Sequence, residues 1–130
     1  MARDGFDPRT AAAEFDLARL AEVSGGDREF ERELSREYTG QSWVLLAQIA
    51  AALERRDGGT LRRSAHTLKG SSRTIGAEGV AVLAALLERI ADEPDLSPAP
   101  GMLERARRSL TATEQALDRY FGSDEYRRAA

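Results

Sequence analysis

The chain has 130 residues, of which 42% are hydrophobic and 32% are charged. This balance fits one folded domain, so we treat residues 1–130 as a single domain with its core between about residues 15 and 121. The net charge of −3 argues against a nucleic-acid-binding protein, because contact with a phosphate backbone requires an excess of basic residues. The sequence has no cysteine, which excludes disulfides and thiol chemistry.

The hydropathy pattern does not indicate a membrane protein. The longest apolar run covers residues 80–87 and is far shorter than the roughly 20 residues that a membrane-spanning helix requires. No basic and apolar leader opens the chain. We therefore expect a cytoplasmic protein that does not interact with membranes.

The first two predicted helices cover the N-terminal part of the chain. A short leading helix is predicted from about Pro8 to Val23, because Asp7 can cap it and proline suits a first helical position. Residues 24–27 hold two glycines and an aspartate, so they end this helix and cap the next. The second helix is predicted from about Asp27 to Arg56. Its apolar residues repeat at helical spacing: Phe30, Leu34, Tyr38, Leu45, Ile49 and Leu53.

Three more helices are predicted in the C-terminal part. Residues 57–60 end the second helix and cap a third, which runs from Thr60 to about Thr74 and is interrupted at Gly76. Helices at 77–91 and about 98–121 follow, separated by a loop at 92–100 that holds three prolines. The apolar stripes of these helices are Leu61, Ala65, Leu68 and Ile75; Val80, Leu83, Leu87 and Ile90; and Leu103, Ala106, Leu110, Leu117 and Phe121.

Each apolar stripe requires a partner face, and short connections make consecutive helices antiparallel neighbours. We therefore predict an all-α fold, an up-down-up-down antiparallel four-helix bundle with a short additional N-terminal helix. Residues 1–6 and 123–130 are expected to fray, because chain ends have few contacts.

The only histidine, His66, lies three residues before the only lysine, Lys69. Beside the core stripe of the same helix, a second row of residues repeats at helical spacing and is basic or titratable: Arg62, His66, Lys69 and Arg73. We expect this row to face water or a partner. An imidazole is nucleophilic near pH 7, and an ammonium group can offset the charge of a phosphoryl group. Such a row, taken alone, is more often a solvated face.

Gly70 follows His66 by one helical turn. A glycine inside a helix costs about 1 kcal/mol relative to alanine, and its benefit here would be the close approach of another surface to the imidazole. Ser71 and Ser72 add small hydroxyl groups nearby. The combination indicates phosphoryl chemistry on a protein partner.

Other chemistry has little support in the sequence. One histidine cannot build a histidine-rich metal site, and we expect no metal. No Gly-x-x-x-x-Gly-Lys-Ser/Thr loop and no Gly-x-Ser-x-Gly elbow occur, so we expect neither a nucleotide-dependent kinase nor a serine hydrolase.

These residues resemble the signature of a known family, the histidine-containing phosphotransfer domains of multistep phosphorelays. The resemblance covers about residues 15–121. It implies that His66 accepts a phosphoryl group from a phosphoaspartate on a receiver domain and passes it to an aspartate on another receiver. The matching segments are residues 66–72 and 75–77, Gly26–Asp27 with Phe30 and Leu34, and residues 86–88.

The resemblance also implies roles for the neighbours of His66. Lys69 would offset the phosphoryl charge, Gly70 would leave room for the receiver, and Ser72 would help to order the site. Glu88 would hydrogen-bond the imidazole. The partners would be response-regulator receiver domains and a hybrid sensor histidine kinase. Mg²⁺ would be held by the receiver, and the chain would be a monomeric carrier with no cofactor and no kinase or ATP site of its own.

Two alternatives stay open at this point. In the first, the chain is the related phosphotransfer domain of a chemotaxis-type kinase, phosphorylated by a kinase domain that uses ATP. In the second, it is a helical bundle that binds a receiver without being phosphorylated. Phosphorylation of the His66 side chain distinguishes the phosphorelay from the second alternative, in which this side chain is never phosphorylated.

Overall fold

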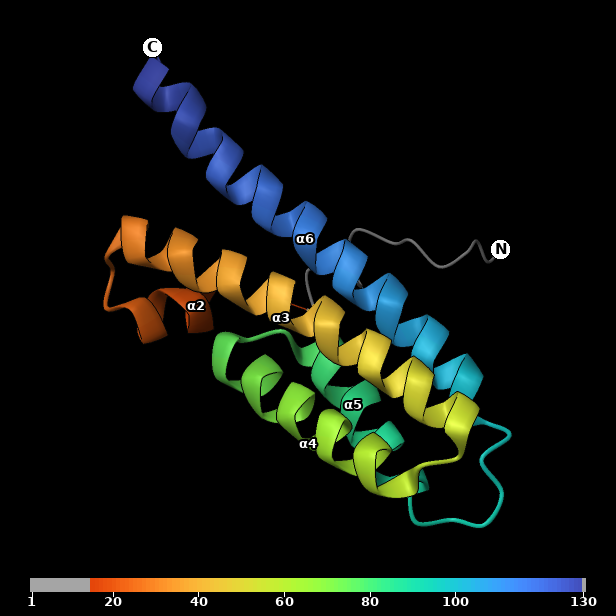
Figure 1. The fold of residues 1–130 in the computed structure, drawn as a ribbon. Coiled ribbons are helices and arrows are strands. Elements are labelled where there is room, and N and C mark those ends of the chain that lie inside the picture. Colours follow the sequence, from red (N-terminus) through yellow and green to blue (C-terminus); the bar gives the residue numbers. More distant parts are fainter. Residues whose placement is uncertain (1–14, 130) are drawn as a thin grey trace.

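The computed structural model describes residues 15–129, with side chains described for residues 15–122. Every regular element in this range is an α-helix (Figure 1): α2 Leu17–Ser24, α3 Arg28–Arg55, α4 Gly58–Ile75, α5 Glu78–Ile90 and α6 Ala99–Ala129. Contacts between α3 and α4, α4 and α5, α5 and α6, and α3 and α6 close a four-helix bundle. Consecutive helices of the bundle run in opposite directions, and α2 packs on α3 and α4. The predicted fold is confirmed.

The leading helix differs from its prediction. It begins at Leu17, because the Asp16 carboxylate accepts the N–H groups of Ala18 and Arg19 at 3.1 and 3.2 Å and caps it there. Residues 15 and 16 are not helical, so the prediction of one helix from Pro8 to Val23 is wrong. The predicted cap at Asp7 lies outside the described residues.

The start of α4 and the ends of α6 also differ from the prediction. The Asp57 carboxylate accepts the backbone N–H and the hydroxyl of Thr60, at 3.0 and 2.7 Å, so α4 already begins at Gly58. The proline-containing loop ends where α6 begins, at Ala99. The backbone of α6 then stays helical to Ala129, so the expected fraying from residue 123 is wrong over that range.

The predicted apolar stripes of α4, α5 and α6 are all buried in one core. On α3 the prediction is wrong for Phe30, which is 43% exposed, while Tyr38, Leu45 and Ile49 are buried as expected. Within residues 15–129, no helix is long and apolar enough to cross a membrane.

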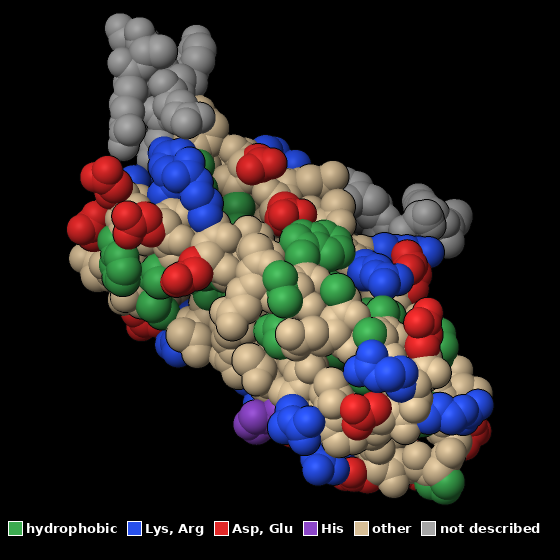
Figure 2. All heavy atoms as spheres, in the orientation of Figure 1, with side chains coloured by type: hydrophobic (Ala, Val, Ile, Leu, Met, Phe, Trp, Pro, Cys, Tyr) green, Lys and Arg blue, Asp and Glu red, His purple; other side chains and the backbone are tan. Residues whose placement is uncertain are grey.

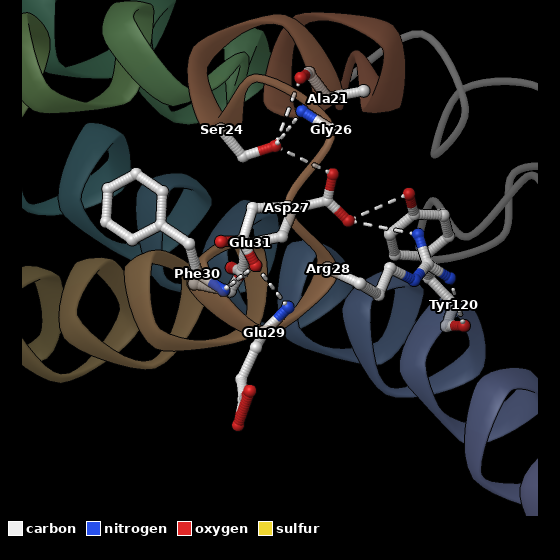
Figure 3. A network of polar contacts seen from close by, with 10 residues as sticks. Ala21, Ser24, Gly26, Asp27, Arg28, Glu29, Phe30, Glu31 and Tyr120 are labelled. Atoms are coloured by element: carbon white, nitrogen blue, oxygen red, sulfur yellow. Dashed lines mark hydrogen bonds and ion pairs between the residues drawn. The ribbon is translucent and has the colours of Figure 1, made fainter.

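A buried carboxylate joins three helices at the end of the bundle that α2 covers (Figure 3). The side chain of Glu31 on α3 is 2% exposed, and it accepts hydrogen bonds from Ser24 of α2 at 3.1 Å and from Tyr120 of α6 at 3.0 Å. Arg28 pairs with the same carboxylate at 3.0 Å and stacks 3.8 Å from the Tyr120 ring centroid. The charge is therefore compensated, which a buried carboxylate requires. This network fixes the end of α2 and the start of α3 relative to α6.

Gly76→Ala is expected to lower the free energy of unfolding by about 1–3 kcal/mol. Gly76 ends α4 at a φ of +96°, and a Cβ there would lie 2.7 Å from the backbone oxygen of Asp16. Urea denaturation measures the effect. The matched control is Gly70→Ala in the middle of α4, where a Cβ meets nothing within 4 Å and stability should rise by up to about 1 kcal/mol. Equal stability of the two variants would contradict this account of the α2–α4 contact.

Candidate functional site

The imidazole of His66 projects from the solvent side of α4. The core stripe of this helix, Leu61, Ala65 and Leu68, is completely buried, and a residue one step from such a stripe is turned about 100° away from it. The His66 side chain is 67% exposed. Figure 2 shows the chain's one histidine, in purple, at the edge of the face that α3 and α4 form. The predicted exposure of His66 is confirmed.

Glu88 on α5 holds the imidazole from one side. Its Oε2 lies 2.8 Å from Nδ1 of His66, and its Oε1 lies 2.6 Å from Nζ of Lys69. The hydrogen bond from Lys69 holds the pKa of the Glu88 carboxyl below its usual range, and the contact with His66 adds to this effect against partial desolvation. The carboxylate is therefore ionised at neutral pH. The contact that the family resemblance implies for Glu88 is present.

This contact decides which ring nitrogen can react. An ionised carboxylate only accepts hydrogen bonds, so the proton of the neutral ring lies on Nδ1. Nε2 then holds the free lone pair. Because the side chain is mostly exposed, an incoming electrophile can reach that nitrogen. The arrangement gives one oriented nucleophile on a rigid helix.

The basic row is less uniform than the sequence indicates. Arg73 is exposed, but Lys69 is only 21% exposed and is paired with Glu88. Arg62 binds Asp92 at 2.7 Å. Sequence reasoning missed Asp92, although it follows Glu88 by four residues and so falls on the same side one turn later. The acidic pair Glu88 and Asp92 therefore faces the row and partly neutralises it.

The three small residues after Lys69 lie in different environments. A Cβ on Gly70 would meet nothing within 4 Å, so no packing inside the chain requires glycine there. The Ser71 hydroxyl donates to the carbonyl of Leu68 at 3.3 Å. Ser72, which the resemblance implies would help to order the site, is fully buried, so a partner cannot touch its side chain.

Ser72 instead connects two helices inside the bundle. Its hydroxyl lies 2.7 Å from the phenol oxygen of Tyr38 on α3. Burial raises the pKa of the Tyr38 phenol, so the pair is neutral at ordinary pH. Ser72 can order the site only indirectly, by fixing α4 against α3. The contact between Tyr38 and Ser72 could not be predicted from the sequence, because the two residues lie on different helices.

No group of three histidine, cysteine, aspartate or glutamate side chains among the described residues could hold a metal ion. The site brings together His66, Lys69 and Glu88, with open space beside Gly70.

A helical bundle that exposes one imidazole, fixed at Nδ1 by a carboxylate, defines a class of protein that carries a group on histidine. Residues 33–119 match the Hpt domain model, and the chain belongs to this family. The structure is similar to the crystal structure of histidine-containing phosphotransfer protein B (HptB) from Pseudomonas aeruginosa PAO1. The TM-score is 0.73 and the sequence identity 28%, over 90% of this chain and 97% of that chain. A search of curated proteins gave no match.

The family assignment confirms the class that the sequence predicts. The protein is a phosphorelay intermediate in two-component signalling. Members of this family are carriers that work with receiver domains and kinases.

Glu88→Ala is expected to slow labelling by a phosphorylated receiver domain about tenfold, which corresponds to about 1.4 kcal/mol of transition-state stabilisation. The change removes the acceptor at Nδ1 and releases Lys69. Glu88→Gln should be slowed less, because the amide oxygen still accepts from Nδ1–H. Rapid-quench kinetics with both variants measure the difference. Equal rates in the wild type and Glu88→Ala would show that Glu88 does not position the ring.

Proposed function

We propose that the chain accepts a phosphoryl group on Nε2 of His66 from the phosphoaspartate of one receiver domain and passes it to the aspartate of another. The observation that carries the proposal is the contact of His66 Nδ1 with the Glu88 carboxylate at 2.8 Å, on a side chain that is otherwise exposed. It leaves Nε2 as the nitrogen that can attack phosphorus.

The transfer step balances without a further reactant. The lone pair of Nε2 forms the N–P bond while the acyl phosphate O–P bond of the donor breaks, and the electron pair of that bond returns to the aspartate carboxylate. The second transfer is the reverse of this step on another receiver. Phosphoryl transfer has a loose transition state, so catalysis consists mainly of positioning and charge stabilisation.

Lys69 and Glu88 act as one unit in this proposal. Glu88 keeps the proton on Nδ1 and accepts more strongly from the ring as positive charge develops on it. Lys69 holds Glu88 ionised, and its ammonium group lies near the imidazole through their common partner. Lys69 can therefore offset the phosphoryl charge without leaving α4. The Mg²⁺ of the reaction is held by the receiver.

The proposal gives the chain no kinase activity of its own. Its donor is a receiver domain of a hybrid sensor histidine kinase, and its acceptor is a response-regulator receiver. The chain acts as a monomer, because one exposed His66 per chain suffices for each transfer.

Labelling from a phosphorylated receiver tests the proposal. A receiver domain phosphorylated with ³²P is mixed with the chain, and the label is followed into the chain and on to a second receiver. A phosphohistidine should be labile in acid and stable in alkali. A label with the opposite stability, or a label that no second receiver removes, would contradict a relay through His66.

A further inference from the structure

Two polar contacts join α4 to the α5 side of the bundle at successive helical turns. In the first, Nδ1 of His66 meets the Glu88 carboxylate at 2.8 Å. In the second, the Arg62 guanidinium meets the Asp92 carboxylate at 2.7 Å. Arg62 precedes His66 by four residues, and Asp92 follows Glu88 by four, which places the second contact one turn from the first. The transfer step requires the first contact and leaves the second without a role.

Fold stability does not explain the Arg62–Asp92 pair. The two side chains are 49% and 65% exposed, and ion pairs this exposed add little to the stability of a fold. Asp92 also lies in the turn after α5, which ends at Ile90, and so beside the negative end of the helix dipole. A carboxylate is unfavourable at that end. The pair therefore requires a reason outside the fold, and the reactive His66 lies one turn away.

The imidazole of His66 leans toward the turn of α4 that holds Arg62. Side chains of a helix tilt toward its N-terminus, so each of them covers the surface about one turn before its own Cα. Residues four apart are neighbours on that surface, so an arginine side chain can reach a group bound to Nε2. Lys69, in contrast, lies on the following turn and is bound to Glu88 at 2.6 Å. Arg62 is thus the cation on the side toward which the ring leans.

A phosphoryl group on Nε2 competes with Asp92 for the guanidinium of Arg62. The phosphoryl group carries about two negative charges, whereas the carboxylate carries one. Arginine binds phosphate and carboxylate groups through the same fork of N–H donors, so one guanidinium does not serve both fully. As long as Asp92 holds the guanidinium, the phosphoryl group receives less compensation for its charge.

We propose that Asp92 withholds Arg62 from the phosphoryl group on His66, and so raises the tendency of the phosphorylated chain to pass that group on. This inference rests on the proposed function, because it concerns the phosphorylated state of His66. Arg62 stabilises that state, and Asp92 is a positioning residue that acts through Arg62. The pair thereby sets the equilibrium between phosphohistidine in this chain and phosphoaspartate in a receiver.

The equilibrium of phosphoryl transfer with a receiver domain that labels the wild-type chain tests the inference. Asp92→Asn should shift this equilibrium about three- to fivefold toward phosphorylated His66, and Arg62→Gln should shift it by about the same factor toward the receiver. The matched controls remove the same charges from the neighbouring exposed residues, as Glu93→Gln and Arg63→Gln. Both controls should leave the equilibrium unchanged. Wild-type equilibria in both Asp92→Asn and Arg62→Gln would overturn the inference.

The double variant Arg62→Gln/Asp92→Asn decides whether Asp92 acts through Arg62. Its equilibrium should equal that of Arg62→Gln, because without the arginine the carboxylate has nothing to withhold. An effect of Asp92→Asn that has the same size with and without Arg62 would overturn the inference, since the aspartate would then act by its own charge. Asp92→Glu keeps the carboxylate and should rescue the wild-type equilibrium.

The phosphoryl group itself provides a readout that needs no receiver. Phosphoramidate, a small phosphoryl donor that needs no docking, charges His66, and ³¹P NMR then follows the titration of the bound group. A nearby cation favours the doubly charged form, so Asp92→Asn should lower the pKa of the phosphoryl group and Arg62→Gln should raise it. An unchanged phosphoryl pKa in both variants would overturn the inference. If no phosphorylated receiver labels the wild-type chain, the proposed function fails, and this titration still decides the role of the pair.

Discussion

His66→Gln is expected to abolish labelling by a phosphorylated receiver domain, with a loss of at least about 1,000-fold. The amide has no nucleophilic nitrogen, and His66 is the only histidine of the chain, so no second imidazole can take its place. Rapid-quench labelling of the wild type and the variant measures the effect.

The fold should survive this substitution. The His66 side chain is 67% exposed and its one described hydrogen bond is to Glu88, so the free energy of unfolding should change by no more than about 0.5 kcal/mol. Circular dichroism and urea denaturation provide the control. Retained acid-labile label in a folded His66→Gln variant would show that the phosphoryl group is carried elsewhere.

Gly70→Gln is expected to slow transfer from a receiver about tenfold or more while leaving stability unchanged or higher. A Cβ at this position meets nothing within 4 Å, so the chain itself has room for a side chain. Glutamine is also a better helix former than glycine, by several tenths of a kcal/mol. The cost must then come from the partner, whose surface would meet the new side chain one turn from the imidazole. Transfer kinetics and urea denaturation on the same samples measure both quantities.

Gly70→Ala is the matched control for this effect. It gives at least as large a gain in helix propensity with a much smaller side chain, so transfer should be slowed less than in Gly70→Gln. Phosphoramidate should label both variants at the wild-type rate, because it needs no docked surface. If Gly70→Gln accepts from the receiver as fast as the wild type, the glycine is merely tolerated in α4 and leaves no room that a partner uses.

The two substitutions test different parts of the site. His66→Gln removes the reacting atom, and Gly70→Gln keeps it but blocks access. A chain that binds receivers without being phosphorylated would lose binding in the second variant and show no label in the wild type. A phosphorelay carrier is labelled in the wild type. It is not labelled in His66→Gln, which lacks the reacting atom, and it is labelled more slowly by a receiver in Gly70→Gln, which blocks access.

The sequence alone determines the helices and most of the core. Apolar residues at helical spacing predict which sides of α4, α5 and α6 are buried, because a helix stripe of that kind is stable only against a partner. Local spacing also predicts that His66 lies beside the stripe of α4 and is exposed. These features depend on the 100° turn per residue and on nothing distant in the chain.

Contacts between helices decide the rest. The meeting of His66 and Lys69 with Glu88 depends on the register of α5 against α4, and the burial of Ser72 depends on Tyr38 from α3. No local pattern gives such a register. The start of the leading helix is set by the Asp16 cap, and the backbone N–H of Asp16 donates to the carbonyl of Gly76 at the end of α4. The sequence therefore determined the nucleophile and the bundle, and the tertiary structure decided which nitrogen of that nucleophile is free and what surrounds it, because side chains far apart in the chain meet only after the helices have packed.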